Sequence, residues 1–256
     1  MSRTLLRGAR VITMTPGRPD AEHLDILVDG DRIAAVDENI EAPDAEVVDF
    51  SGRILIPGLV NAHLHTWQTA LRSVGADWTL MEYLTHLHGE CVGHYTPADM
   101  HISNLAGALN QLNCGTTTLG DWCHNALSPE HADAAVEGLA HAGIRAVFLH
   151  GTAYRSPDTP HPLTEIDRLL DGSVRDRALL TLGMALQGPQ YSSPDTASQP
   201  GEGSPPLWCI ETTRPRSAPA RKSANAGRAT SASLRAPWRA PARSRRRSCS
   251  RSRGSV

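Results

Sequence analysis

Two patterns of hydrophobic and polar residues divide the chain near residue 57. Residues 4–57 show short apolar, β-rich runs separated by turn residues, and LDILVDGDRIAAVD has two such runs that meet at DGD, which predicts a hairpin. The stretch AEVVDFSGRILIPG adds two shorter strands, separated by Ser51 and Gly52. We therefore predict a small β-sheet over residues 1–57 that carries no catalytic residues of its own.

From residue 58 onward, strand patterns alternate with helix patterns. The stretches LVNAHLHT, TTTLGDW, RAVFLHG and ALLTLGMALQGP are typical of strands, and the last three begin near residues 116, 145 and 179. This spacing of roughly 30 residues is the size of a βα unit. The intervening sequence carries helix signals: a cap at Thr96 or Ser128 and a stop at Gly115 or Gly143. The pattern predicts an α/β fold with about four βα units over residues 58–197, where a closed barrel requires eight.

The alternation stops after GPQYSSPD. Residues 211–256 hold 12 Arg, 1 Lys and 1 acidic residue, whereas residues 1–210 hold 12 basic and 26 acidic residues. Arg, Ser, Ala and Pro fill 34 of the last 46 positions, so this segment cannot bury enough apolar surface to offset its ordering entropy. We predict a disordered tail over residues 198–256.

The sequence predicts a cytoplasmic protein. No run approaches the roughly 18 apolar residues of a membrane span, and the start, MSRTLLRGARVITMTP, has no signal-peptide pattern. The 5 cysteines show no C-x-x-C spacing, which is typical of reduced thiols. We expect no membrane partner.

The stretch PGLVNAHLHTW contains the clearest candidate chemistry. Residues two apart on a strand point to the same face, so His63 and His65 are predicted to project together. In a parallel barrel that face is the interior, and the carboxyl end of the strand is where active sites lie. Two imidazoles there suit one divalent metal ion. The alternative is that both are ordinary polar residues at the end of a strand.

The flanking sequence resembles the amidohydrolase superfamily. The leader, PGLVNAHLH, QTALRSVGADWTLMEYL, CGTTTLGDW and GPQYSSP occur in the order shown by its cytosine-deaminase and triazine-hydrolase branch, over about residues 4 to 197. The resemblance implies an incomplete (β/α)8 barrel beside half of a β-sandwich. It also implies that His63 and His65 bind Zn²⁺, with Fe²⁺ as the alternative, and that the metal activates a water which hydrolyses a non-peptide C–N bond.

The resemblance further suggests residues near the substrate. Gln68 and Arg72 lie just beyond the histidine pair, and Asp121, Trp122 and His124 end the second strand. Each has an alternative account, as a polar residue of a surface loop or of a solvated cluster. The implied substrate is a heterocyclic amine such as an aminopurine, a pyrimidine or a triazine, and full-length relatives are often homo-oligomers.

The later ligands of the family have no counterpart in the sequence. The family takes a third His and a Glu from strand five, a His from strand six and an Asp from strand eight, whereas the last His here is His161 and the last Asp is Asp195. We therefore expect the encoded chain to be inactive. A frameshift near residues 195–204, or a truncation, is our hypothesis for the change. Translation of the DNA in all three frames tests it, and the hypothesis fails if no other frame continues the barrel.

Two other functions remain open. The basic tail would attract phosphates without specificity, but it lacks regular Arg-Ser repeats and an aromatic pattern that stacks on bases, so no specific nucleic-acid partner is predicted. A non-catalytic fragment with a structural role is the other alternative.

Overall fold

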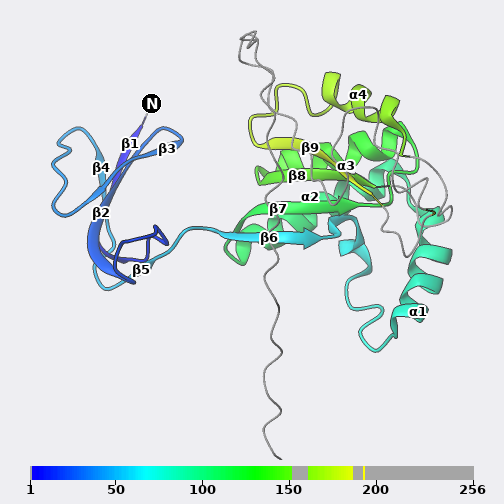
Figure 1. Ribbon diagram of the computed structural model, residues 1–256, viewed down its shortest axis with the longest axis horizontal. Coiled ribbons are helices and arrows are strands. Elements are labelled where there is room, and N and C mark those ends of the chain that lie inside the picture. The colour runs from blue at the N-terminus through cyan, green and yellow to red at the C-terminus, as the bar shows by residue number, and fades with distance from the viewer. Residues whose placement is uncertain (1, 152–160, 187–192, 194–256) are drawn as a thin grey trace, which may run out of the picture. The chain divides into compact units, whose positions relative to one another are not determined.

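The computed structural model describes residues 2–151, 161–186 and 193 of the 256-residue chain. The described residues form two separate sheets (Figure 1). The predicted tail at residues 198–256, and with it the alternative of nucleic-acid binding, lies outside the described residues. The bounds of the three predicted domains stay predictions.

The first sheet contains five strands in the order β3-β2-β1-β4, with β5 also paired to β1. Their bounds are β1 (Arg3–Val11), β2 (Glu22–Asp29), β3 (Arg32–Asp37), β4 (Glu46–Asp49) and β5 (Ile54–Leu55). The strands β2 and β3 are antiparallel and join at Gly30, whose φ is +59°, so the hairpin predicted at DGD is confirmed. Both β4 and β5 run parallel to β1.

One carboxylate, Asp25, is buried in the first sheet. Its Oδ1 accepts a hydrogen bond from the Gly8 amide at 2.8 Å, and its Oδ2 accepts one from the Ile40 amide at 3.1 Å. The Arg7 guanidinium lies 3.5 Å from the same carboxylate. Both oxygens of Asp25 are therefore satisfied, and the residue joins β1, β2 and the segment after β3.

The second sheet is parallel, with the strand order β6-β7-β8-β9. Its strands are β6 (Leu59–Leu64), β7 (Thr116–Cys123), β8 (Arg145–Gly151) and β9 (Leu180–Ala185). The principal connecting helices are α2 (Pro97–Asn113), α3 (Pro129–Ala142) and α4 (Leu163–Asp171). The predicted α/β fold with a parallel sheet is confirmed, and the observed strand starts lie within one residue of the predicted ones.

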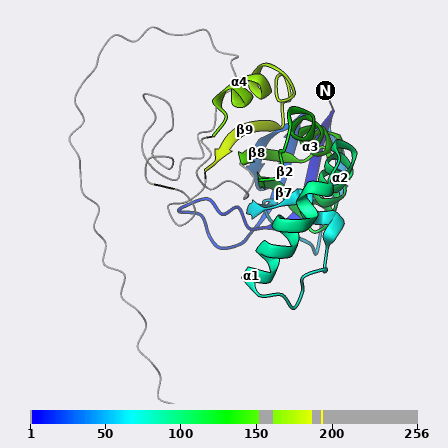
Figure 2. The same ribbon diagram turned by 90° about the vertical axis from the view of Figure 1, so that its right-hand side faces the viewer.

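The core of this part lies between the parallel sheet and the helices α2 and α3, which cover one face of it (Figures 1 and 2). From the strands it contains the inward side chains Leu119, Cys123, Ala146, Phe148 and Leu182, and from α3 it contains Ala132, Ala135, Val136 and Leu139. Successive strand residues alternate between the faces, so Trp122 projects to the opposite face from Asp121 and Cys123.

Helix capping follows the sequence with one exception. At the start of α2, Thr96 and Asp99 form a reciprocal capping box, and Gly143 ends α3 with a φ of +71°. Ser128 stands at the cap position of α3, but its hydroxyl bonds the side chains of Glu130 and His131 instead of a backbone amide. The predicted side-chain cap at Ser128 is therefore wrong in its hydrogen bond, because neighbouring polar side chains compete for the hydroxyl.

The segment between β6 and α2 contains short helices that the sequence patterns did not predict. They are the 3₁₀-helix η1 (Thr66–Leu71), the helix α1 (Leu80–Glu82), its π-helical continuation η2 (Tyr83–Cys91) and the 3₁₀-turn η3 (Val92–His94). Thr79 and Glu82 form a capping box at the start of α1. In the described ranges, no helix is long and apolar enough to cross a membrane.

Candidate metal centre

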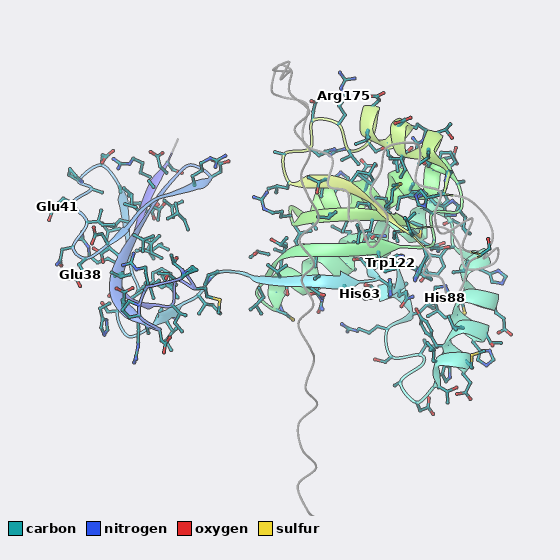
Figure 3. The ribbon with its side chains drawn as sticks, viewed as in Figure 1. Glu38, Glu41, His63, His88, Trp122 and Arg175 are labelled. Atoms are coloured by element: carbon teal, nitrogen blue, oxygen red, sulfur yellow. The ribbon has the colours of Figure 1, made fainter. Side chains whose placement is uncertain are left out.

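His63 lies at the carboxyl end of β6 (Figure 3), and His65 directly follows that strand. Their ring nitrogens face each other. The two Nε2 atoms are 3.3 Å apart, and the rings meet at 79°. Two imidazoles bound to one tetrahedral zinc at about 2.0–2.1 Å have their nitrogens about 3.3 Å apart. The pair therefore has the separation that two ligands of one metal ion require.

The neighbouring strand fixes the ring of His65. Its Nδ1–H donates to the backbone carbonyl of Trp122 over 2.8 Å, and this bond leaves the lone pair on Nε2. Burial lowers the pKa of His65, which keeps the imidazole neutral as a metal ligand requires. Directly after it, the Thr66 amide donates to Asp121 Oδ1, also over 2.8 Å.

Aromatic rings form a wall around the pair. His124 stacks on His65 with a centroid separation of 4.3 Å, and Trp122 lies 5.5 Å from the ring of His63. Trp67, which is fully buried, donates its indole N–H to His124 Nδ1 at 3.1 Å. Burial lowers the pKa of His124 to about 2, so this imidazole is uncharged at neutral pH. The wall is therefore aromatic, and its imidazole His124 carries no charge.

A second chain of contacts leads from this wall to Gln68. The His88 ring packs edge-on against His124 at 4.4 Å, and its Nε2 lies 2.9 Å from the Tyr83 hydroxyl. The Gln68 amide donates to the same hydroxyl at 2.6 Å. Burial lowers the pKa of His88 to about 4 and raises the pKa of Tyr83, so both groups are neutral near pH 7.

The structure brings most of the residues singled out in the sequence together. Ring contacts connect His63, His65, Trp122 and His124 into one cluster. Gln68 joins this cluster through the Tyr83 hydroxyl. Arg72 is exposed after the end of η1. Asp121 is fully buried within β7, which excludes the alternative that it belongs to a solvated loop.

Three members of the cluster were not predicted from the sequence: Trp67, Tyr83 and His88. The capping box formed by Thr79 and Glu82 was the available signal, because it predicts a helix that carries Tyr83 and His88. Within the part of the chain that the structure describes, no three His, Cys, Asp or Glu side chains converge as a complete metal-binding group. The two histidines fit a divalent ion in separation, protonation and support, as part of a ligand set.

Comparisons with known proteins point to one group of enzymes. No protein-family model matches the chain. It is 31% identical over 132 residues to the 5-methylthioadenosine/S-adenosylhomocysteine deaminase of Thermococcus kodakarensis, covering 52% of this chain and 30% of that enzyme. It is 28% identical over 199 residues to the deaminase of the same name from Bacillus thuringiensis, covering 75% and 45%. The chain thus spans less than half the length of these curated relatives.

Solved structures share the fold of this chain. Atrazine chlorohydrolase from Arthrobacter aurescens TC1, complexed with zinc, matches with a TM-score of 0.64 and 22% identity over 76% of this chain and 49% of that one. Guanine deaminase from C. acetobutylicum with bound guanine matches with a TM-score of 0.57 and 18% identity over 73% and 46%.

Proposed function

The chain belongs to the amidohydrolase superfamily, in the branch related to cytosine deaminase and triazine hydrolase, and on this premise we propose that it forms part of a metal-dependent hydrolase of non-peptide C–N bonds. The proposed reaction is the deamination of a heterocyclic amine, such as an aminopurine, a pyrimidine or a triazine. The relatives carry names of deaminases and of a chlorohydrolase that act on such rings.

The observation that carries the proposal is the Nε2–Nε2 separation of 3.3 Å between His63 and His65, with the His65 ring held by the Trp122 carbonyl. We propose that this pair holds a divalent metal ion. Imidazole suits both zinc and iron, and zinc is our first choice because the similar chlorohydrolase is complexed with zinc. A metal ion held by His63 and His65 would lower the pKa of a bound water enough to make it a nucleophile at neutral pH.

The protein's own groups would bind and orient the ring. Trp122 and His124 offer flat, uncharged faces against which a heterocycle stacks. The Gln68 amide nitrogen is engaged by Tyr83, so its carbonyl oxygen is left to accept a hydrogen bond from a ring N–H or amino group. Arg72, on the exposed segment after η1, stays a candidate for contact with the outer part of a larger substrate.

We also propose that the parallel sheet is the first half of a (β/α)8 barrel. Four parallel strands with helices on one face, and a histidine pair at the carboxyl end of the first strand, support this assignment. On this proposal the first sheet is half of a β-sandwich, with divisions near residues 57 and 197. The further metal ligands would come from strands of the other barrel half.

The test is ammonia release from aminopurines, aminopyrimidines and aminotriazines by the zinc-loaded chain, with His63→Ala/His65→Ala as the control. Because two imidazoles hold zinc weakly, we expect little turnover, and we expect that turnover to vanish in the double variant. Turnover that survives in the double variant would exclude a role for the pair. If the chain neither binds zinc nor releases ammonia from any of the three ring classes, the proposed function is wrong.

A further inference from the structure

Two consecutive residues of β7 hold the two consecutive residues that follow β6. The Trp122 carbonyl accepts the Nδ1–H of His65, and the Asp121 carboxylate accepts the amide of Thr66, each over 2.8 Å. The first bond sets the orientation of the His65 ring, and the second sets the backbone from which that ring projects. The amide of Thr66 is also the first in η1, and the side chain of His65 does not cap it.

The burial of Asp121 at this place in the fold should lower the stability of the protein. It is fully buried, its Oδ2 has no hydrogen-bond partner among the described residues, and no basic side chain there forms an ion pair with it. Burial raises the pKa of its carboxyl to about 6, although the amide and the side chain of Thr66 oppose that rise. A buried carboxylate without a cation costs stability, and an apolar residue of similar size would avoid that cost.

Asp25 shows what a purely structural carboxylate looks like in the same chain. Both of its oxygens accept backbone amides, and the Arg7 guanidinium lies beside it. Asp121 instead directs one oxygen to the single amide that follows His65. The difference indicates that Asp121 serves the placement of that histidine more than the stability of the sheet.

We propose that Asp121 is a positioning residue for the metal ion: it holds the Thr66 amide and thereby keeps His65 Nε2 opposite His63 Nε2. This inference rests on the proposed metal site at the histidine pair. It assigns no contact between Asp121 and the metal, because the carboxylate lies on the helix-covered face of the sheet, whereas Trp122 and the histidine pair lie on the other face. Partners that orient metal ligands typically change metal affinity by about 10–100-fold when they are removed.

The first test is the Zn²⁺ affinity of the full chain, measured by isothermal titration. We expect Asp121→Leu to weaken Zn²⁺ binding by about 10–100-fold, and we expect Asp121→Asn to retain most of the affinity because its amide oxygen can still accept the Thr66 N–H. Thr66→Val keeps the backbone amide and removes the hydroxyl, so it should bind like the wild type. Asp25→Leu is the matched control, since it removes the other buried carboxylate and should leave the affinity unchanged.

A second measurement uses the wild-type chain alone, so it does not depend on whether Asp121→Leu folds. Because coupling is reciprocal, Zn²⁺ should slow hydrogen exchange at the Thr66 amide and leave the Gly8 amide, which Asp25 holds, unaffected. A wild-type chain that binds no Zn²⁺ would contradict the proposed function itself. Normal Zn²⁺ binding, with equal affinity in Asp121→Leu or with no added protection at Thr66, would overturn this inference alone.

Discussion

In the described residues, each of the two sheets buries one carboxylate, Asp25 in the first and Asp121 in the second. Asp25 uses both oxygens on backbone amides and lies beside Arg7, so its burial is compensated. Asp121 bonds one amide at the entrance to a histidine cluster. Two buried carboxylates can therefore serve different purposes, and the bonding of their oxygens within the described residues distinguishes them.

The histidines also differ between the two parts of the molecule. The chain has 12 histidines, and the first sheet contains only His23, whose side chain is exposed. In the second part, burial lowers the pKa values of His65, His88, His124, His150 and His161. Neutral imidazoles are the form that binds metals, and three of these five, His65, His88 and His124, are in ring contact near the end of β6.

The largest expected effect is the loss of stability when a fully buried aromatic side chain is removed, either in the wall of the site or away from it. Trp67→Ala and Phe148→Ala each remove a fully buried aromatic side chain, and each should lower the free energy of unfolding by about 3–5 kcal/mol. Only Trp67→Ala also removes the donor to His124, so only that variant should weaken Zn²⁺ binding under native conditions. Urea unfolding followed by far-UV circular dichroism, together with titration of the folded variants, checks both parts. Equal Zn²⁺ affinities would show that the wall does not support the pair.

The next largest effect should be a difference in stability between variants of the two buried carboxylates. Asp25→Leu leaves the buried amides of Gly8 and Ile40 without their acceptor, at a cost of about 1–3 kcal/mol for each. Asp121→Leu strips one amide but also removes a buried charge, so its cost should be smaller. Urea unfolding of the two variants measures the difference. The reverse order would mean that Asp121 is the structural carboxylate of the pair.

The stability of the part that contains the buried histidines should depend on pH. Burial lowers the pKa of His161 to about 4, whereas an unfolded histidine titrates near 6.5. The unfolded chain therefore takes up a proton first as the pH falls, so this contribution to stability is complete above about pH 6.5. It declines by up to about 1.4 kcal/mol per pH unit between pH 6.5 and 4.

His161→Gln should lose stability less steeply than the wild type over that window, and His23→Gln, at an exposed position, should follow the wild type. The free energy of unfolding at pH 7.5, 6 and 5 decides between them. A slope for His161→Gln that equals that of the wild type would contradict the assigned burial effect.

The smallest effect concerns the link to Gln68. Tyr83→Phe removes the hydroxyl that joins Gln68 to His88, and it should lower the free energy of unfolding by about 0.5–1.5 kcal/mol. Chemical unfolding under identical conditions is sensitive enough to detect this change. No change in stability would indicate that water replaces the hydroxyl at no cost, so that Gln68 is not held by Tyr83.

The sequence patterns succeeded where structure is local. The DGD turn, the Thr96 cap and the period of roughly 30 residues each depend on neighbouring residues, and the hairpin, α2 and the parallel strands are found there. The joint orientation of His63 and His65 likewise follows from the alternation along one strand. The short helices between β6 and α2 were missed because 3₁₀ and π-helical turns do not repeat every 3.6 residues.

The contacts that hold the site residues in place could not be predicted from the sequence, for a different reason. The bonds from His65 to Trp122 and from Thr66 to Asp121 join residues that are more than 50 positions apart. Nothing in the local pattern of either strand specifies that these residues meet, because the register between β6 and β7 shifts within the strands. Such contacts require the sheet to be built first.

The most direct test of the account is the Zn²⁺ stoichiometry and affinity of three forms of the full chain: the wild type, His63→Ala/His65→Ala and His101→Ala/His141→Ala. The last is a matched control, because His101 and His141 also form a close pair, with ring nitrogens 2.9 Å apart, but they lie on the exposed surfaces of α2 and α3. We expect one Zn²⁺ site in the wild type and in the control, and its loss in His63→Ala/His65→Ala. Undiminished binding in that variant, or loss of the site in the control instead, would contradict the assignment of the metal centre.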